Sequence, residues 1–149
     1  MKIQIISIGK LSGEIATLAA RYQKMTSWQI KDVTLAHSKK GSESQVKLDE
    51  SKSIIAKINK NAHVIALDLS GKQCVSQDFS SIFAKQMMVG KDVDFIIGGA
   101  FGLDDSVLAK TNAKLSLSKM TFPHQIAKLL LLEQIYRAET ILNNHPYHK

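Results

Sequence analysis

The chain has 149 residues, of which 44% are hydrophobic and 22% are charged. This length allows a substantial buried core, and the composition is that of an ordinary globular protein. No apolar run approaches the ~18 residues that a membrane span needs, and the opening Met1–Gly9 lacks a signal-peptide cleavage site, so neither a membrane protein nor a secreted precursor is expected.

The charge of the chain favours a polyanionic partner. Twenty lysine and arginine residues face 13 aspartate and glutamate residues, which gives a net charge of +7. Such a surplus is typical of proteins that bind RNA or DNA. The lysines are dispersed, however, and a basic surface that only keeps the protein soluble is the alternative. The single cysteine, Cys74, excludes an internal disulfide and fits a reducing cytoplasm.

Hydrophobic periodicity predicts alternating strands and helices within a single domain, residues 1–149. The expected elements, in chain order, are a strand at Lys2–Ile8, a helix at Gly13–Met25, a strand at Trp28–Leu35, a polar loop at Ala36–Glu43, a helix at Gln45–Asn59, a strand at His63–Leu69, a helix at Gln77–Met88, a strand at Val93–Ile97, a short helix at Asp104–Lys110, a short strand at Ala113–Ser116 and a long helix at His124–Asn143. This order predicts an α/β fold with a mostly parallel sheet flanked by helices.

Three segments lie just beyond predicted strands, at the carboxyl ends where parallel sheets bind ligands. They are Leu67–Gly71, Gly98–Gly102 and Leu117–Phe122. The glycines of the second segment would let a ligand approach the backbone, although a tight turn alone also explains them. The glycine patterns of dinucleotide-binding and phosphate-binding loops are absent, and Ser70–Lys72 is expected to form a glycine turn.

The predicted final helix carries more apolar residues than one buried face requires. The surplus predicts a second buried face and therefore a homodimer through this helix. A helix sunk centrally in the core of its own subunit is the alternative.

The chain closes with Asn144–Lys149, a run that is rich in proton-handling groups. His145 or His148 could serve as a base near neutral pH, and Tyr147 could stack on a nucleobase. A frayed chain end is the alternative. The five histidines form no helical metal-binding pair, so no metal site is expected.

Several segments become recognisable when they are taken together. They are Lys2–Lys10, Ala66–Lys72, Phe95–Leu103, Leu115–Gln125, Glu133–Ala138 and His145–Lys149. In combination they closely resemble the small bacterial methyltransferases of the SPOUT superfamily that modify N3 of a pseudouridine in large-subunit ribosomal RNA, the RlmH family. The resemblance spans the whole chain, and the combination of motifs is specific although each motif alone is not.

The resemblance implies a deep trefoil knot in the C-terminal half, which no sequence pattern would propose. It also implies S-adenosylmethionine as the cofactor. The residues that it assigns to the cofactor are Leu67, Gly98, Leu117, Ser118, Lys119, Met120, Thr121 and Phe122. Direct methyl transfer to an imide nitrogen requires a base and the exclusion of water.

The resemblance further implies an active site that is completed across a dimer by the tail. His145, Tyr147 and His148 are then candidates for the base and for positioning the target, and Arg137 and Lys149 for contacts with RNA. Arg137 could instead pair with Glu133, one helical turn earlier.

The predicted function is methylation of ribosomal RNA in the cytoplasm, on free RNA, the large subunit or the ribosome. A non-catalytic dimeric factor that binds RNA or ribosomes on the same scaffold is the alternative. An α/β enzyme that acts on a nucleotide-sized substrate is a third possibility.

Overall fold

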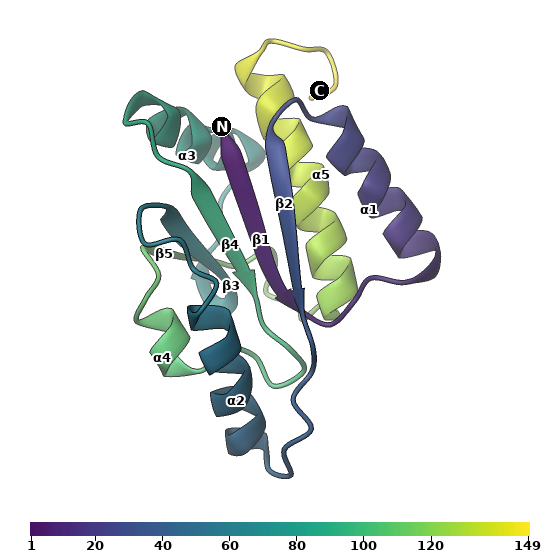
Figure 1. The fold of residues 1–149 in the computed structure, drawn as a ribbon. Helices are drawn as coiled ribbons and strands as arrows, with labels where there is room; N and C mark the ends of the chain where they lie inside the picture. Colours follow the sequence, from purple (N-terminus) through teal and green to yellow (C-terminus); the bar gives the residue numbers. More distant parts are fainter.

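A computed structural model describes residues 1–149 as five strands and five helices that alternate along the chain (Figure 1). The strands are β1 (Lys2–Ile8), β2 (Gln29–Leu35), β3 (His63–Lys72), β4 (Val93–Ile97) and β5 (Ala113–Leu115). The helices are α1 (Gly13–Met25), α2 (Glu43–Ile55), α3 (Ser76–Met88), α4 (Asp105–Leu108) and α5 (His124–Leu142). All ten elements predicted from the sequence are present, most of them with ends within two residues of those predicted.

The five strands form one parallel sheet in the order β2-β1-β4-β3-β5. Each helical connection returns the chain to the starting edge of the sheet, so every carboxyl strand end lies at the same edge. The central strand β4 is buried along its whole length, as the apolar run Phe95–Ile97 predicts, and the burial includes Asp94. The predicted α/β fold is confirmed.

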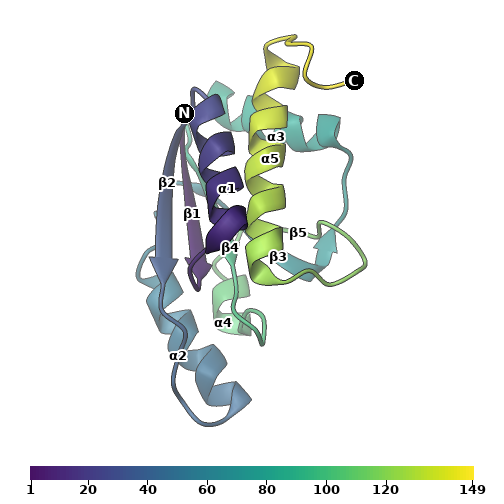
Figure 2. The ribbon, with the colours of Figure 1, turned by 90° about the vertical axis from the view of Figure 1, so that its right-hand side faces the viewer.

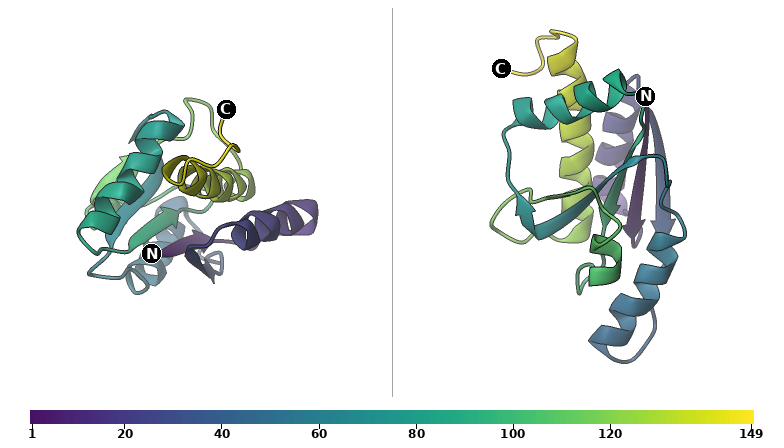
Figure 3. Two further views of the ribbon diagram at one scale, coloured as in Figure 1. Left: turned by 90° about the horizontal axis from the view of Figure 1, so that it is seen from above. Right: turned by 90° about the vertical axis from the view of Figure 1, so that its left-hand side faces the viewer.

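Helices cover both faces of the sheet (Figures 2 and 3). The larger core joins the sheet to α3 and α5 through residues such as Phe83, Phe95 and Leu131. The smaller core joins the other face to α2 and α4 through residues such as Ile54 and Ile96. Neighbouring residues of β4 thus point into different cores, because successive side chains of a strand face opposite sides.

The long helix α5 packs between α1 and α3 and completes the larger core. Its inner stripe consists of Leu131, Leu132, Ile135 and Ala138, each at most 1% exposed. This central position accounts for most of the apolar surplus seen in the sequence. It agrees with the alternative prediction, in which the helix is sunk in the core of its own subunit. Leu130, on the outer face, remains 36% exposed. No helix of the chain has the length and hydropathy of a membrane span.

Two buried charged side chains fix α5 against the sheet and the turn after α1. Lys128 Nζ, 1% exposed, donates hydrogen bonds to Ser7 Oγ at 2.9 Å and to Asp32 Oδ1 at 2.6 Å. The Glu139 carboxylate accepts hydrogen bonds from the Ser27 backbone amide and from the hydroxyls of Thr26 and Ser27. Because a buried charge is costly unless it is paired, these contacts specify where along the sheet α5 must sit.

The prediction of a glycine turn at Ser70–Lys72 is wrong, because β3 continues through these residues. Its end crosses β5 at close range: the Ser116 amide donates to the Lys72 carbonyl at 3.1 Å. A β-carbon added to Gly71 would lie 2.6 Å from the Leu115 carbonyl carbon. The glycine therefore serves a backbone-to-backbone crossing rather than a chain reversal.

We expect the substitution Gly71→Ala to lower the free energy of unfolding by about 1–3 kcal/mol, because the added methyl group overpacks two backbone segments. Urea denaturation followed by circular dichroism measures the change. Gly41→Ala is the matched control, since the nearest atom to its added β-carbon is 3.9 Å away. Equal denaturation midpoints for the wild-type protein and Gly71→Ala would contradict the close crossing.

Candidate functional site

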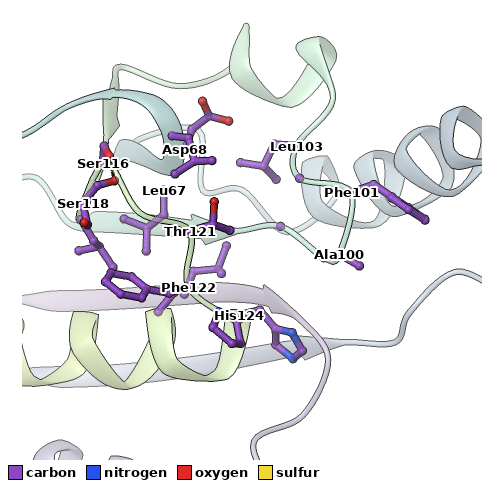
Figure 4. Close-up of a pocket in the computed structure, with 18 of the residues that line it drawn as sticks. Leu67, Asp68, Ala100, Phe101, Leu103, Ser116, Ser118, Thr121, Phe122 and His124 are labelled. Carbon is purple, nitrogen blue, oxygen red and sulfur yellow. Dashed lines mark hydrogen bonds between the residues drawn. The ribbon is translucent and has the colours of Figure 1, made fainter.

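The main cavity lies at the carboxyl edge of the sheet, where the segments after β3, β4 and β5 converge (Figure 4). Its volume is about 940 Å³, a size that suits a nucleotide-sized ligand. The three loops predicted from the sequence all contribute to its wall. Leu67, Leu117 and Phe122 supply apolar surface, and Figure 4 shows Thr121 and Phe122 on the segment that faces Leu67.

The hydroxyl-rich segment after β5 holds its own shape by local hydrogen bonds. Ser116 Oγ donates to the Ser118 carbonyl at 2.8 Å, and Ser118 Oγ accepts from the Met120 amide at 3.0 Å. Such bonds between side chains and the nearby backbone stabilise irregular turns. The sequence predicts a ligand site at this segment, and the structure shows that the hydroxyls of Ser116 and Ser118 stabilise the loop that lines the cavity.

The segment after β4 forms a tight turn that also lines the cavity. The Gly102 amide donates to the Gly99 carbonyl at 3.0 Å, and Gly102 has a φ of 78°, a conformation that favours glycine. A β-carbon on Gly98 would lie 2.9 Å from the Gly102 carbonyl carbon. The tight turn that the sequence allowed at Gly98–Gly102 is confirmed, and this turn forms part of the cavity wall.

Seven of the eight residues that the resemblance assigns to a cofactor line this cavity. They are Leu67, Gly98, Leu117, Ser118, Met120, Thr121 and Phe122. The eighth, Lys119, is exposed and lies outside the lining. Sequence reasoning missed Glu43 and Lys47, which α2 brings to the cavity from a distant part of the chain. Asp68 lies in the predicted ligand loop Leu67–Gly71 and lines the cavity, although it was not among the residues assigned to the cofactor.

One histidine borders the cavity at the start of α5. The His124 ring packs edge-on against His37, with 5.6 Å between the ring centres. Burial, followed by the nearby charges of His37 and Lys128, lowers the pKa of His124, which is therefore neutral at pH 7. Its Nε2 atom is buried without a hydrogen-bond partner. No three histidine, cysteine, aspartate or glutamate side chains are grouped so that they could hold a metal ion.

The C-terminal tail, residues 143–149, lies at the far end of α5 from the cavity (Figures 1 and 2). The helix has 19 residues, which at 1.5 Å per residue span about 28 Å. His145, Tyr147, His148 and Lys149 are all absent from the cavity wall. Within one subunit, the structure therefore separates the candidate catalytic residues from the candidate cofactor residues.

The tail folds back onto the outer face of α5, where Glu133 is its main anchor. Glu133 Oε1 accepts hydrogen bonds from Tyr147 OH at 3.1 Å and from Arg137 Nε at 3.0 Å. The Arg137 guanidinium lies over the Tyr147 ring, 4.8 Å from its centre. The helical pair of Arg137 and Glu133, which the sequence offered as an alternative, is confirmed.

The contacts of the tail keep the Tyr147 phenol protonated and fix the orientation of the His148 ring. Burial first, then contacts with Tyr22 and Glu133, raises the pKa of the Tyr147 phenol. His148 Nδ1 lies 3.3 Å from Arg137 Nη1, and its Nε2 lies 2.8 Å from the Gln77 amide. Because a guanidinium can only donate, Nδ1 is the acceptor in this pair and the ring hydrogen lies on Nε2. Gln77 must then present its carbonyl oxygen to that proton.

The family of this chain follows from comparison with known proteins. Residues 1–148 match the family described as "Predicted SPOUT methyltransferase". The chain belongs to the SPOUT methyltransferase family. It is 40% identical to ribosomal RNA large subunit methyltransferase H 1 of Clostridium perfringens, and 42% identical to the proteins named ribosomal RNA large subunit methyltransferase H in Clostridium tetani and Acholeplasma laidlawii. Each alignment covers 100% of both chains, so the resemblance to the RlmH family is confirmed.

Solved structures share the SPOUT fold at low sequence identity. A putative RNA methyltransferase from Bacillus anthracis has a TM-score of 0.57 at 14% identity, over 97% of this chain and 96% of that chain. A putative methyltransferase from Legionella pneumophila, solved in complex with S-adenosylmethionine, has a TM-score of 0.50 at 12% identity, over 93% of this chain and 66% of that chain. At these identities the likeness shows the fold alone.

We expect Glu133→Gln to release the tail from α5, because hydrogen bonds to a charged carboxylate contribute about 1.5–3 kcal/mol each. Carboxypeptidase should then remove His148 and Tyr147 roughly 10-fold faster, as measured by mass spectrometry of the intact chain. Glu14→Gln, an exposed glutamate of α1, is the matched control. Unchanged trimming in Glu133→Gln would show that Glu133 does not anchor the tail.

Proposed function

We propose that this protein is an S-adenosylmethionine-dependent methyltransferase that methylates N3 of a pseudouridine in large-subunit ribosomal RNA. One observation carries the proposal: three loops distant in sequence converge into a single cavity, and seven of the eight residues that the RlmH resemblance assigns to the cofactor line it. The names of the full-length relatives support ribosomal RNA as the substrate.

The residues of the cavity suit an adenosine-based cofactor. Leu67, Leu117, Met120 and Phe122 provide apolar walls for a flat ring. The irregular backbone of Leu117–Phe122 offers amides and carbonyls that can read a base edge, since this segment forms no regular secondary structure. The bound cofactor supplies an electrophilic methyl group, and the protein must align the target nitrogen with it and exclude water.

We infer that the tail acts on the cavity of a partner subunit. About 28 Å of helix separates the tail from the cavity of its own subunit. A two-fold axis through the outer face of α5 would reverse the direction of the second helix and place each tail beside the other cavity. Leu130, an apolar residue that is 36% exposed on the outer face of α5, supports an interface there.

The roles of the tail residues follow from this arrangement. His145, Tyr147 and His148 are the proposed groups for positioning the target and removing the N3 proton. In the folded-back tail, His148 Nδ1 is engaged by Arg137 and the Tyr147 phenol is held protonated, so both need new surroundings to act as a base. Arg137 and Lys149 are the proposed contacts with RNA phosphates.

We also infer that the chain is knotted, as the family resemblance implies. The tight crossing of β3 and β5 at Gly71 and Leu115 supports this chain path, because it brings two loop-bearing segments into backbone contact. A cytoplasmic location remains a prediction from the sequence.

Calorimetry with S-adenosylhomocysteine and methyl transfer to ribosomal fractions test the proposed activity. We expect the wild-type protein to bind the cofactor product and to transfer a labelled methyl group to one pseudouridine, located by mapping the modified base. Thr121→Arg, which fills the cavity from an exposed position, should weaken cofactor binding by more than ~10-fold. Absent heat and absent thermal shift in the wild-type protein would favour the non-catalytic RNA-binding factor.

Mixing two inactive variants tests whether the tail works across the dimer. Thr121→Arg lacks a usable cavity, and Tyr147→Ala/His148→Ala lacks a working tail. If each tail serves the partner's cavity, refolding the two variants together should restore about a quarter of the wild-type activity, because half of the dimers are mixed and each contains one complete site. Mixed dimers without activity would contradict this arrangement, as would a 16.5 kDa species in light scattering.

A further inference from the structure

The segment between β2 and α2 carries two lysines at the edge of the sheet that holds the cavity. This segment, residues 36–42, is termed the lysine loop after Lys39 and Lys40. Figure 1 shows it at the same end of the molecule as the turn after β4, far from both chain termini. The helix that follows contributes Glu43 and Lys47 to the cavity wall. The lysine loop is therefore joined directly to the cavity.

The charges of the lysine loop are free to bind a ligand. The two salt bridges of the structure both involve α5, one through Lys128 and one through Arg137. Lys39 and Lys40 are exposed and belong to neither bridge. Lys47, on the side of the cavity, lies near Asp104. Local hydrogen bonds first, and then the charge of Lys47, lower the pKa of the Asp104 carboxyl, so the charge of Lys47 is partly balanced. The two unpaired ammonium groups of Lys39 and Lys40 are adjacent in the chain and attract a polyanion.

Hydrogen bonds hold the backbone of the lysine loop in place. Glu50, 5% exposed, accepts a hydrogen bond from the Ser38 amide at 3.1 Å. The hydroxyl of Ser38 accepts in turn from the Lys40 amide at 3.2 Å. Because the backbone of the loop is already ordered, binding of a ligand to the two lysines costs little conformational entropy, which favours affinity.

The buried carboxylate of Glu50 also contacts the wall of the cavity. A β-carbon on Gly99 would lie 2.7 Å from Glu50 Oε2, so the second oxygen of Glu50 packs against the turn after β4. At the other end of the loop, Ser42 and Gln45 form a capping box that keeps the first turn of α2 helical. The lysines are thus held at a fixed position relative to the cavity.

We infer that the lysine loop is a binding surface for the phosphate backbone of the RNA substrate, on the subunit whose cavity holds the cofactor. The inference rests on the proposed function, which supplies the polyanion. Lysine ammonium groups bind phosphates as point charges and do not read base edges as arginine does. The loop thus fixes the position of the RNA without selecting its sequence. The target base would lie between this loop and the tail of the partner subunit.

The test compares Lys39→Ala/Lys40→Ala with Lys57→Ala/Lys60→Ala. The second pair removes the same charge from exposed lysines between α2 and β3, away from the cavity wall. Binding to purified bacterial large ribosomal subunits and to assembled ribosomes is measured over a series of salt concentrations. For Lys39→Ala/Lys40→Ala we expect the slope of log affinity against log salt to become shallower by about 1.4–1.8, which corresponds to two lost phosphate contacts.

Methylation kinetics and cofactor binding complete the test. KM for the ribosomal substrate should rise about 10-fold in Lys39→Ala/Lys40→Ala while kcat stays unchanged, because phosphate contacts of this kind bind the ground state and the transition state equally. The control pair should behave as the wild-type protein in every measurement. A wild-type salt slope in Lys39→Ala/Lys40→Ala, or a slope that changes equally in the control pair, would overturn the inference.

Binding of S-adenosylhomocysteine separates this inference from the proposed activity. The affinity of Lys39→Ala/Lys40→Ala for S-adenosylhomocysteine should equal that of the wild-type protein, and a loss would assign the loop to the cofactor instead of the RNA. Failure of the methyltransferase proposal would appear in the wild-type protein as absent cofactor binding, whereas failure of the lysine loop appears only in the comparison of salt slopes.

Discussion

Parallel pairing of all five strands is the constraint on which the site depends. Because each strand runs in the same direction, the segments that follow β3, β4 and β5 must emerge at one edge of the sheet. The first and last of these segments begin at Leu67 and Leu117, 50 residues apart along the chain, and the sheet brings them into one wall. Strand order adds to this, since β4 and β5 both border β3 and their loops therefore flank Leu67.

In the proposed dimer, helix α5 is the element that makes the site depend on two subunits. Its first residues border the cavity, and its last residues carry the tail, so the rigid length of the helix separates cofactor-binding groups from proton-handling groups. The buried contacts of Lys128 and Glu139 prevent the helix from sliding along the sheet to close this gap. This geometry fits the proposed catalysis between subunits, in which a partner helix that runs in the opposite direction would supply the missing groups.

Sequence periodicity was sufficient for the secondary structure but failed where tertiary contacts decide the outcome. Strands β1 and β4 were predicted with correct ends because their apolar runs stop at charged or glycine residues. The predicted end of α2 was too late because Ile58 continues the apolar pattern, whereas in the structure it packs on the smaller core from a turn outside the helix. The pairing of Lys72 with Leu115 of β5 depends on a crossing that no local pattern encodes.

The site, like the secondary structure, was predicted where local sequence decides it and was missed where tertiary contacts decide it. Loops at strand ends and the family motifs located the cavity, but the lining residues Glu43 and Lys47 come from a helix whose sequence resembles any solvated helix. Periodicity cannot reveal a buried polar anchor such as Lys128, since its partners Ser7 and Asp32 lie 121 and 96 residues away in the chain.

Glu50 illustrates why such anchors matter for function. One of its carboxylate oxygens orders the lysine loop and the other packs against the turn that lines the cavity, so a single buried charge joins two surfaces that would contact different ligands. A loop held only by its own residues would lose more conformational entropy on binding. In the proposed complex, this shared anchor would fix the distance between the cofactor and the RNA backbone. Methyl transfer depends on that distance because the reacting atoms must be held in line.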